Sequence, residues 1–550
     1  MIKYLTTFAI ILLIVGWSPA PAQGSSRESD ILRISVQSRI PSELDSGAYI
    51  LVNEIRHWKP EETAIIICDM WDQHWCRSAT KRVNELAPVV DKVVKIAREK
   101  GVLIVHAPSD VVDYYDGTPQ RELGERYPDK KLGELLSGDK LAKEMYAFWP
   151  IDQSDEGCDC EEKCRVHYPW TRQHEAIEIM TGDVISDSGK EMAGLFRNRG
   201  ISNVILVGVH VNMCIVNRSF GLRNMVRLGT NVVLMRDLTD AMYNPEMAPQ
   251  VSHFTGNSLM FEYIESYIAP TMVSTDFTGE KQFRFKDDPR PLVAFVTAEG
   301  EYRANQRLPE FAHALLLKEN VNCEFALGKP AMEGEGRHNM ENLQILQDAD
   351  LAVFFARRRA LEHDKMALIR DFVLSEKPVM GIRTASHAFD ARKPIPREGG
   401  PMTLTDGTVT ELLDQWPEFD REVLGGNYQG HYGQQEEGTK ISVIPGMEAH
   451  PLLHSFPLEG FTSSGTLYRN RPLRSTHAQV LLMGTIPGQE AEPVFWINDT
   501  GKNKVIYTSL GHWDDWEEEE FRKLMINSVR YLLGKEISKY SDDEETNLYK

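Results

Sequence analysis

Short apolar runs alternate with helical patterns along most of this chain, and this alternation constrains the fold more than any other feature of the sequence. In the first half, one helical pattern places Val83, Leu86 and Val90 on the same face and ends at Gly101. Strands and helices that alternate at this spacing form a mostly parallel sheet covered by helices on both faces. The apolar runs that we expect to be its strands are residues 64–68, 102–105, 176–179, 204–207 and 232–235.

A second alternation of the same kind follows a polar stretch at residues 274–290, which lacks a sustained apolar period. Its expected strands include 292–296, 351–355 and 379–382, and a strand-rich part precedes a last helix near 521–533. A length of 550 residues allows several domains. The sequence therefore predicts two doubly wound, mostly parallel α/β domains in tandem. We place them at 28–273 and 291–536, with a linker at 274–290 and an acidic tail at 537–550.

The charge balance excludes several classes of partner. The chain has 61 Lys and Arg against 81 Asp and Glu, a net charge of −20, and this field repels phosphate backbones and anionic lipid surfaces. We therefore expect a small-molecule substrate and no nucleic acid. Because 42% of the residues are hydrophobic, the chain can bury cores, which excludes wholesale disorder.

The N-terminus has the pattern of an export signal. Residues 8–17 are apolar, Lys3 precedes them and Ala20-Pro21-Ala22 follows, and the run is too short to span a bilayer with ordinary flanks. We expect residues 1–22 to be a signal peptide, and the mature protein to be periplasmic or secreted without a stable membrane span. An uncleaved N-terminal anchor is the alternative. In an oxidising compartment, seven cysteines leave at least one thiol without an intramolecular partner.

Asp69 and Cys214 follow two expected strands of the first half. In open α/β sheets the chemistry lies beyond the carboxyl ends of the strands, so both side chains are candidates for one site. Cys214 also opens an expected helix, whose unpaired N–H groups and dipole would stabilise a thiolate or an oxyanion. The alternative is a buried and inert cysteine, the commoner fate of a lone cysteine in apolar surroundings.

The segments around these two residues resemble the isochorismatase-like cysteine hydrolase family. They are Ile67-Cys-Asp-Met-Trp71, Gly208-Val-His-Val-Asn-Met-Cys214 and Asp237-Leu-Thr-Asp240, and the resemblance extends over about residues 64–268. It implies a doubly wound fold, homo-oligomers, and hydrolysis of amide-type C–N bonds by an Asp, a Lys and a Cys, without a cofactor. Asp69 and Cys214 match the first and last of these. Asp69 would carry the thiol proton to the leaving amine, and the N–H groups of Met213 and Cys214 would stabilise the oxyanion.

The lysine of this triad has no counterpart at the matching strand end, where residues 180–183 are Met, Thr, Gly and Asp. Arg172, before that strand, or Lys190, in the following helix, would supply a cation that lowers the thiol pKa, and we favour Arg172. An arginine cannot shuttle protons at ordinary pH. Either Asp69 does so alone, or the domain is catalytically silent; the sequence leaves both alternatives open.

Asp72, His74 and His106 also lie near these strand ends. The nicotinamidase branch of the resembled family binds a divalent metal with Asp and His there. Its Asp-x-His pair after the second strand is absent from His106-Ala-Pro-Ser-Asp110. We therefore expect pocket-lining polar residues and no metal at this position.

Three cysteines, Cys158, Cys160 and Cys164, lie within seven residues of a long polar insertion. A disulfide, within the trio or to Cys76, is favoured for an exported chain. The alternative is a zinc site, for which His167 is a conceivable fourth ligand. Either way, the sequence predicts a structural role, in which the insertion forms a stiffened lid over Cys214.

The second half resembles another family. Residues 379–389 read as a strand that runs into a small-residue turn, similar to the nucleophile elbow of class I glutamine amidotransferase folds, with Arg383 at the nucleophile position. Together with Gly425-Gly-Asn-Tyr-Gln-Gly-His431 and Tyr507-Thr-Ser-Leu-Gly-His512, this resembles the trehalose-utilisation (ThuA-like) family over about residues 292–533. That family keeps the scaffold without its cysteine and is associated with sugars and their oxidised derivatives.

Four histidines of this half, His387, His431, His450 and His512, lie at expected turns beside Gly, Pro or Ser. Loop ends of this kind converge on pockets, so we expect His387, His431 and His512 to bind a sugar-derived ligand. The alternative is that they are solvated loop histidines. Because a guanidinium is no nucleophile at ordinary pH, Arg383 excludes glutaminase activity.

Overall fold

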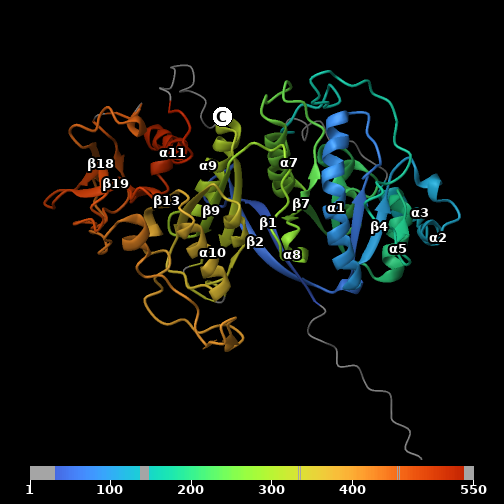
Figure 1. Cartoon of the computed structure of the whole chain (residues 1–550), viewed down its shortest axis with the longest axis horizontal. Helices are drawn as coiled ribbons and strands as arrows, with labels where there is room; N and C mark the ends of the chain where they lie inside the picture. Colours follow the sequence, from blue (N-terminus) through green and yellow to red (C-terminus); the bar gives the residue numbers. More distant parts are fainter. Residues whose placement is uncertain are drawn as a thin grey trace, which may run out of the picture.

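The computed structural model contains two α/β halves that lie side by side (Figure 1). It describes residues 31–136, 148–331, 333–334, 336–454, 456–457 and 459–537. The expected signal peptide and nearly all of the expected acidic tail lie outside the described residues. Within these ranges, no helix has the length and apolar character needed to cross a membrane.

The first half is built on a sheet that has eight strands among the described residues, in the order β2-β1-β8-β7-β6-β3-β4-β5. Strands β3 to β8 pair in parallel, whereas β1 and β2 form an antiparallel hairpin at the edge. The strands are β1 (Leu32–Pro41), β2 (Tyr49–Trp58), β3 (Thr63–Cys68), β4 (Leu103–Ala107), β5 (Val184–Ile185), β6 (Asn203–Val209), β7 (Asn231–Asp240) and β8 (Thr271–Met272).

Helices cover both faces of this sheet, and each face has its own apolar core. The longest helix, α1, buries Val83, Leu86 and Val90 against one face, as its sequence period predicts. The helices are α1 (Arg77–Glu99), α2 (Pro119–Glu125), α3 (Lys130–Leu135), α5 (Gly189–Arg199), α6 (Leu222–Leu228), α7 (His253–Tyr267) and α8 (Thr275–Thr278), with short turns η2 (Pro60–Glu62), η3 (Val112–Tyr115) and η4 (Val211–Ile215).

The second half has a larger sheet, with ten strands in the part of the chain that the structure describes, in the order β11-β10-β9-β12-β13-β20-β19-β18-β16-β17. Strands β10, β9, β12, β13 and β20 are parallel, and the chain then turns antiparallel through β19, β18 and β16. The strands are β9 (Leu292–Ala298), β10 (Asn322–Gly328), β11 (Met340–Glu341), β12 (Leu351–Ala356), β13 (Val379–Ile382), β16 (Thr439–Val443), β17 (Thr462–Ser463), β18 (Ala478–Thr485), β19 (Glu492–Asp499) and β20 (Lys504–Thr508); β14 (Met402–Thr403) and β15 (Val409–Thr410) pair separately.

Helices again cover this sheet on both faces, over two apolar cores. The described helices are α9 (Ala304–Glu319), α10 (His363–Leu374) and α11 (Glu519–Leu532), with short turns η5 (Leu343–Gln347), η6 (Arg383–His387), η7 (Asp420–Leu424), η8 (Pro451–Leu453) and η9 (Asp515–Glu517). Two mostly parallel α/β domains are therefore confirmed.

One predicted strand is wrong. Residues 176–179 form no strand, and the next strand of the sheet is the two-residue β5, at Val184–Ile185. Ile177 is nevertheless buried, because it packs from a loop onto the core beside α1. The short apolar run thus indicates burial rather than strand pairing. The strand end that was matched to the lysine of the family triad is therefore misplaced.

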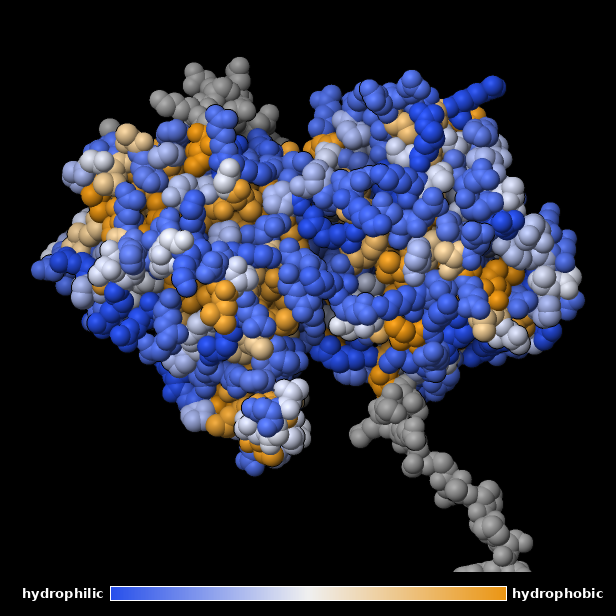
Figure 2. All heavy atoms as spheres, viewed as in Figure 1, coloured by the Kyte–Doolittle hydropathy of each residue, from blue (hydrophilic) through white to orange (hydrophobic). Residues whose placement is uncertain are grey.

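The β1–β2 hairpin connects the two halves, and it was not predicted from the sequence. Its strand β1 pairs with β8 of the first sheet, while Leu51 of β2 is buried in a core of the second half. Arg33 of β1 binds Glu341 at 2.6 Å, and Arg236 of β7 binds Glu324 of β10 at 2.8 Å. The outer surface in this view is mainly hydrophilic, with apolar residues in small separate groups (Figure 2).

Candidate active site

Asp69 and Cys214 lie at the carboxyl ends of neighbouring parallel strands. Asp69 directly follows β3, and Cys214 lies in η4, directly after β6. These strands are adjacent where the strand order reverses, the usual place for ligands in such folds. Gly208 permits the close approach of the two strand ends, because a Cβ there would lie 2.1 Å from the carbonyl oxygen of Cys68. The structure therefore brings the two predicted residues together.

The Asp69 carboxylate is fully buried and is held by three groups. Its Oδ1 accepts a hydrogen bond from the N–H of Ser109 at 2.8 Å, and its Oδ2 lies 3.2 Å from Nε of Arg218. Burial raises the pKa of Asp69, whereas Arg218 and hydrogen bonds from Cys214 and Ser109 oppose that rise. Asp69 also has a φ of 48°, in the left-handed region, which a non-glycine residue adopts mainly where the surroundings impose it.

The Cys214 thiol is held in its protonated form. Burial raises its pKa well above the usual range, and the negative charge of Asp69 raises it further, while Arg218 opposes both effects. A thiol in these surroundings is a weak nucleophile by itself. It becomes a nucleophile when a neighbouring base takes its proton, and Asp69 is within hydrogen-bonding reach.

The cation of this site is Arg218, and this corrects the sequence interpretation. Arg218 contacts Asp69 and also binds Asp110 at 3.2 Å, and its side chain is 31% exposed. Arg172, the arginine that we favoured, lies instead 3.9 Å from Glu175. The sequence carries a signal that was missed: Arg218 follows Cys214 by four residues, and its N–H donates to the Cys214 carbonyl oxygen as in a helical turn.

The two predicted oxyanion donors, the N–H groups of Met213 and Cys214, belong to the backbone of η4. The N–H of Met213 donates to the carbonyl oxygen of His210 at 3.0 Å, so this donor is engaged within the turn. An oxyanion role for Met213 requires that it give up or share this hydrogen bond. The role of the Cys214 N–H stays a prediction.

Aromatic rings from separate segments stack beside the Asp69 strand end. Trp71 stacks on Trp170 of the insertion with ring centroids 4.5 Å apart, and its indole N–H donates to the Ser109 carbonyl oxygen at 3.0 Å. His74 lies between Trp170, at 5.8 Å, and His210, at 4.9 Å, again between ring centroids. The insertion thus contributes an aromatic ring beside the site, and its role as a lid stays a prediction.

The structure does not bring Asp72, His74 and His106 together. Asp72 accepts hydrogen bonds from the hydroxyl and the N–H of Thr171, at 2.6 and 2.9 Å. His106 is fully buried between Gln173 and Asp183, at 3.0 and 3.1 Å. Asp72 and His106 therefore each have structural partners of their own.

In the second half, Arg383 lies at the end of β13 and begins η6, with a φ of 43°. Its guanidinium is buried between two tyrosine rings, 4.1 Å from the centroid of Tyr302 and 4.8 Å from that of Tyr468. It also donates to the carbonyl oxygen of Ser509 at 2.7 Å. The side chain at the elbow is thus a cation sandwiched by aromatic faces.

Three predicted histidines surround this sandwich. His387 and His431 lie 6.2 and 6.3 Å from Tyr468, and His512 lies 5.8 Å from Tyr302, between ring centroids. His387 is buried, and burial together with four arginines holds its pKa well below the usual range.

His450 lies elsewhere. It caps η8 through the N–H of Leu452 and packs 6.2 Å from Tyr531 of α11, between ring centroids. In the described structure, His450 therefore has a structural role at the start of η8.

Comparisons with known proteins fall separately on the two halves. Residues 293–532 match the family model described as trehalose utilisation (ThuA). A search of curated proteins finds no match to the chain. A ThuA-like protein from Parabacteroides merdae is 14% identical at a TM-score of 0.32 and is matched over 46% of this chain and 94% of its own.

Two further solved structures are similar to this chain. A cysteine hydrolase from Pseudomonas syringae is 19% identical at a TM-score of 0.26, over 40% of this chain and 92% of its own. An isochorismatase family protein from Burkholderia thailandensis is 11% identical at a TM-score of 0.23, over 40% of this chain and 95% of its own. The family match over residues 293–532 agrees with the ThuA-like resemblance predicted for about residues 292–533.

Proposed function

We propose that the first domain is a cysteine hydrolase that cleaves an amide-type C–N bond. The observation that carries this proposal is the contact between Cys214, Asp69 and Arg218 at adjoining strand ends. It joins a nucleophile, a buried carboxylate and a cation, which is the set of groups that acyl transfer through a thiol requires.

The proton moves between Cys214 and Asp69 in each half of the reaction. Asp69 accepts the thiol proton as the sulfur attacks the amide carbonyl, and it then gives this proton to the leaving amine. The C–N bond breaks and a thioester forms on Cys214. Water attacks the thioester, Asp69 takes a proton from the water, and the sulfur leaves with that proton, so that acid and free enzyme result.

Arg218 has an electrostatic role in this scheme. It stabilises the ionised form of Asp69, without which the carboxyl cannot accept the thiol proton. A guanidinium cannot exchange protons at ordinary pH, so Asp69 is the only proton carrier of the scheme. The same observation supports the alternative of a catalytically silent domain, in which the thiol stays protonated.

A panel of simple amides separates these two alternatives. Amine or ammonia release is measured for the wild type and for Cys214→Ala and Asp69→Asn, with Cys323→Ser as a cysteine control in the other half. The hydrolase proposal expects release that both site variants abolish and the control retains. Release by none of the proteins, or equal release by Cys214→Ala, contradicts it.

For the second domain we propose binding of a sugar or an oxidised sugar derivative. The three histidines around the sandwich of Arg383, Tyr302 and Tyr468 offer hydrogen-bond partners for sugar hydroxyls. Burial and then four arginines lower the pKa of His387, and the positive field of these arginines favours a ligand that bears a carboxylate. The family description, trehalose utilisation, supports the sugar class.

Calorimetric titration of the full-length protein tests this assignment with neutral sugars, keto-sugars and sugar acids. His387→Ala and His512→Ala are the site variants, and His450→Ala is the matched control. We expect weaker binding in the site variants alone, and tighter binding of the acids than of the neutral sugars. Equal affinity in the site variants and the wild type contradicts the assignment.

Export of the protein and assembly into homo-oligomers belong to the same proposal. The pattern of residues 1–22 supports export, and the family resemblance of the first half supports assembly. A mature mass that begins near Gln23, and a native mass that is a multiple of it, are the expected results. A cytoplasmic chain that begins at Met1 contradicts export.

A further inference from the structure

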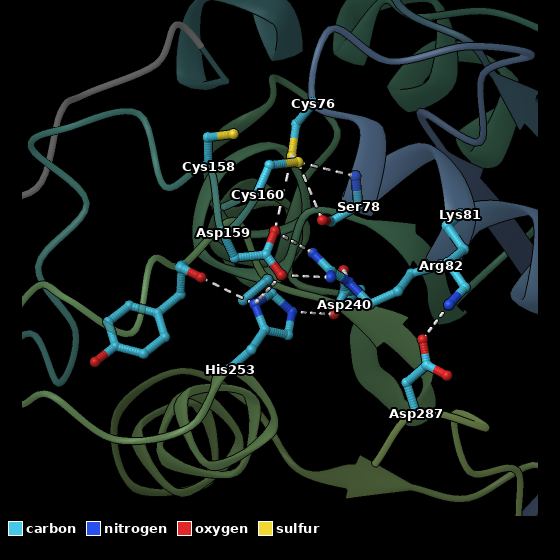
Figure 3. Close-up of polar contacts among 12 residues, drawn as sticks. Cys76, Ser78, Lys81, Arg82, Cys158, Asp159, Cys160, Asp240, His253 and Asp287 are labelled. Carbon is cyan, nitrogen blue, oxygen red and sulfur yellow. Dashed lines mark hydrogen bonds and ion pairs between the residues drawn. The ribbon is translucent and has the colours of Figure 1, made fainter. Parts of the chain in front are cut away.

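Four cysteines gather at the start of α1, although they come from two distant segments. Cys76 immediately precedes the helix, while Cys158, Cys160 and Cys164 belong to the insertion; Figure 3 shows the first three of these side chains and their neighbours. We name these residues the four-cysteine cluster. All four thiols are free, and three of the residues are buried.

The spacing of three of the sulfurs is that of a metal site rather than of a disulfide. The sulfurs of Cys76, Cys158 and Cys160 lie within 4.8 Å of one another, with Cys76 and Cys160 at 3.8 Å. The sulfur of Cys164 lies outside this group of three but only 3.6 Å from that of Cys160, so it is the adjacent fourth sulfur. Four thiolates bound tetrahedrally to zinc at about 2.3 Å have sulfurs about 3.8 Å apart. A disulfide requires about 2.05 Å.

The first turn of α1 directs hydrogen bonds at these sulfurs. The N–H of Ser78 lies 3.4 Å from Sγ of Cys160, and its hydroxyl lies 3.1 Å from the same atom. The N–H of Arg77 donates to Cys164, and the N–H of Ala79 donates to Cys76. Hydrogen-bond donors of this kind orient the sulfurs at the start of the helix.

A buried ionic network backs the cluster (Figure 3). Sγ of Cys76 lies 3.7 Å from Oδ1 of Asp159, and Arg82 binds Asp159 at 2.7 Å and Asp240 at 2.6 Å. His253 in turn lies 2.9 Å from Asp240. Arg82 bridges Asp159 of the insertion and Asp240 of β7, so the network fixes the position of the insertion beside α1.

We propose that the four-cysteine cluster binds one zinc ion through four thiolates. Binding displaces four protons, one from each thiol, and leaves a tetrathiolate of charge −2 with no oxidation of sulfur. His167, a conceivable ligand from the sequence, is exposed and lies 2.9 Å from the carbonyl oxygen of Arg165, and Cys76 takes its place as the fourth ligand.

The zinc ion links the insertion to Cys76, which precedes α1 and lies seven residues after Asp69 in the chain. Trp170, on the same insertion, stacks on Trp71 beside Asp69. Zinc therefore has a structural role at this site: it holds the lid segment against the candidate active site. This inference stands whether or not the first domain proves to be a hydrolase.

The test is metal analysis of the full-length protein, purified without chelator in the presence of zinc. We expect one zinc per chain in the wild type and in the Cys323→Ser control, and less than a tenth of that in Cys160→Ser. Cys164→Ser, which changes the most exposed of the four, is a milder variant in case Cys160→Ser does not fold. Cobalt in place of zinc should give the visible absorption of a tetrahedral tetrathiolate.

A measurement on the unmodified wild type complements the variants. Titration with a mercurial reagent should release the zinc as four thiols react, and these should map by peptide mass to the four-cysteine cluster. Three results overturn the proposal: a metal-free protein whose four thiols alkylate freely, a metal-free protein in which they form disulfides, or zinc that persists in both serine variants.

Discussion

Arg218→Gln should move the pH dependence of Cys214 acylation. The guanidinium Nε lies 3.2 Å from Oδ2 of Asp69. At this separation the ion pair is worth about 1.3 kcal/mol in bulk water and about 5 kcal/mol at an effective protein dielectric of about 20. Since Asp69 is fully buried and Arg218 is 31% exposed, we take an intermediate value of about 3 kcal/mol, or roughly two pH units.

The direction follows from the role of Asp69 as the base. Without Arg218, only hydrogen bonds oppose the rise in the pKa of Asp69 that burial causes, so this pKa rises further above its usual range. The protonated carboxyl cannot accept the thiol proton, and the acidic limb of the rate profile moves to higher pH. At pH values below the pKa of Asp69, the acylation rate of Arg218→Gln should be roughly 100-fold lower than that of the wild type, because a pKa higher by two units leaves roughly 100-fold less ionised Asp69.

The assay is acylation of Cys214 by p-nitrophenyl acetate between pH 5 and pH 9, followed by nitrophenolate release and corrected with Cys214→Ala. Arg218→Lys keeps the charge and should keep the limb within about one pH unit of the wild type. Arg172→Gln, which removes the arginine favoured from sequence, should leave the limb in place. A limb that is unchanged in Arg218→Gln, or that moves in Arg172→Gln instead, refutes the assignment of Arg218.

Three further predictions concern the fold around the sites. Leu51→Ala should lower the free energy of unfolding by about 2–5 kcal/mol, because Leu51 is 2% exposed in a core of the second half; unchanged denaturant unfolding would mean that the hairpin does not join the halves. Burial raises the pKa of Asp420 from 3.8 to about 7, so its contribution to stability is present below pH 3.8 and lost as the pH rises to about 7. Asp420→Asn should therefore reduce the fall in stability between pH 4 and pH 7 by up to about 1.4 kcal/mol per pH unit, and equal slopes in the two proteins would count against it. Trp170→Ala removes a stack worth about 0.5–1.5 kcal/mol and should speed amide hydrogen exchange in residues 148–175, whereas unchanged exchange would show that the stack does not hold the insertion.

The parallel core of both domains was predictable from the sequence because its strands are buried on both faces. Runs such as residues 64–68 and 204–207 are continuously apolar, and in the structure they are the buried strands β3 and β6. The β1–β2 hairpin was missed because its two strands are only partly buried and mix polar with apolar residues. At residues 176–179 the error is the opposite one: a strand was predicted where there is none, because Ile177 is buried although it lies in a loop.

Asp69 and Cys214 were predictable because each lies just beyond a recognisable strand and because the segments around them resemble the isochorismatase-like cysteine hydrolase family. The contact of Arg218 with Asp69 was not predictable, because it depends on how the backbone turns through η4 and brings a residue four positions after Cys214 back to Asp69. Cys76 was named from the sequence as a partner of the trio, but the 3.8 Å spacing of its sulfur from that of Cys160 depends on how the insertion folds back to α1 across more than eighty residues. Hydrophobic periodicity carries no information about such a long-range approach.

The measurement that tests the central claim most directly is the mass of the protein after brief reaction with the amide panel and rapid acid quench. Acid traps a thioester, and peptide mapping locates it. We predict an acyl group on Cys214 in the wild type and in Cys323→Ser, its absence in Cys214→Ala, and its accumulation at high pH in proportion to the ionised fraction of Asp69. A folded wild-type protein that carries no acyl group on Cys214 with any amide, or one that carries it on another residue, contradicts the account.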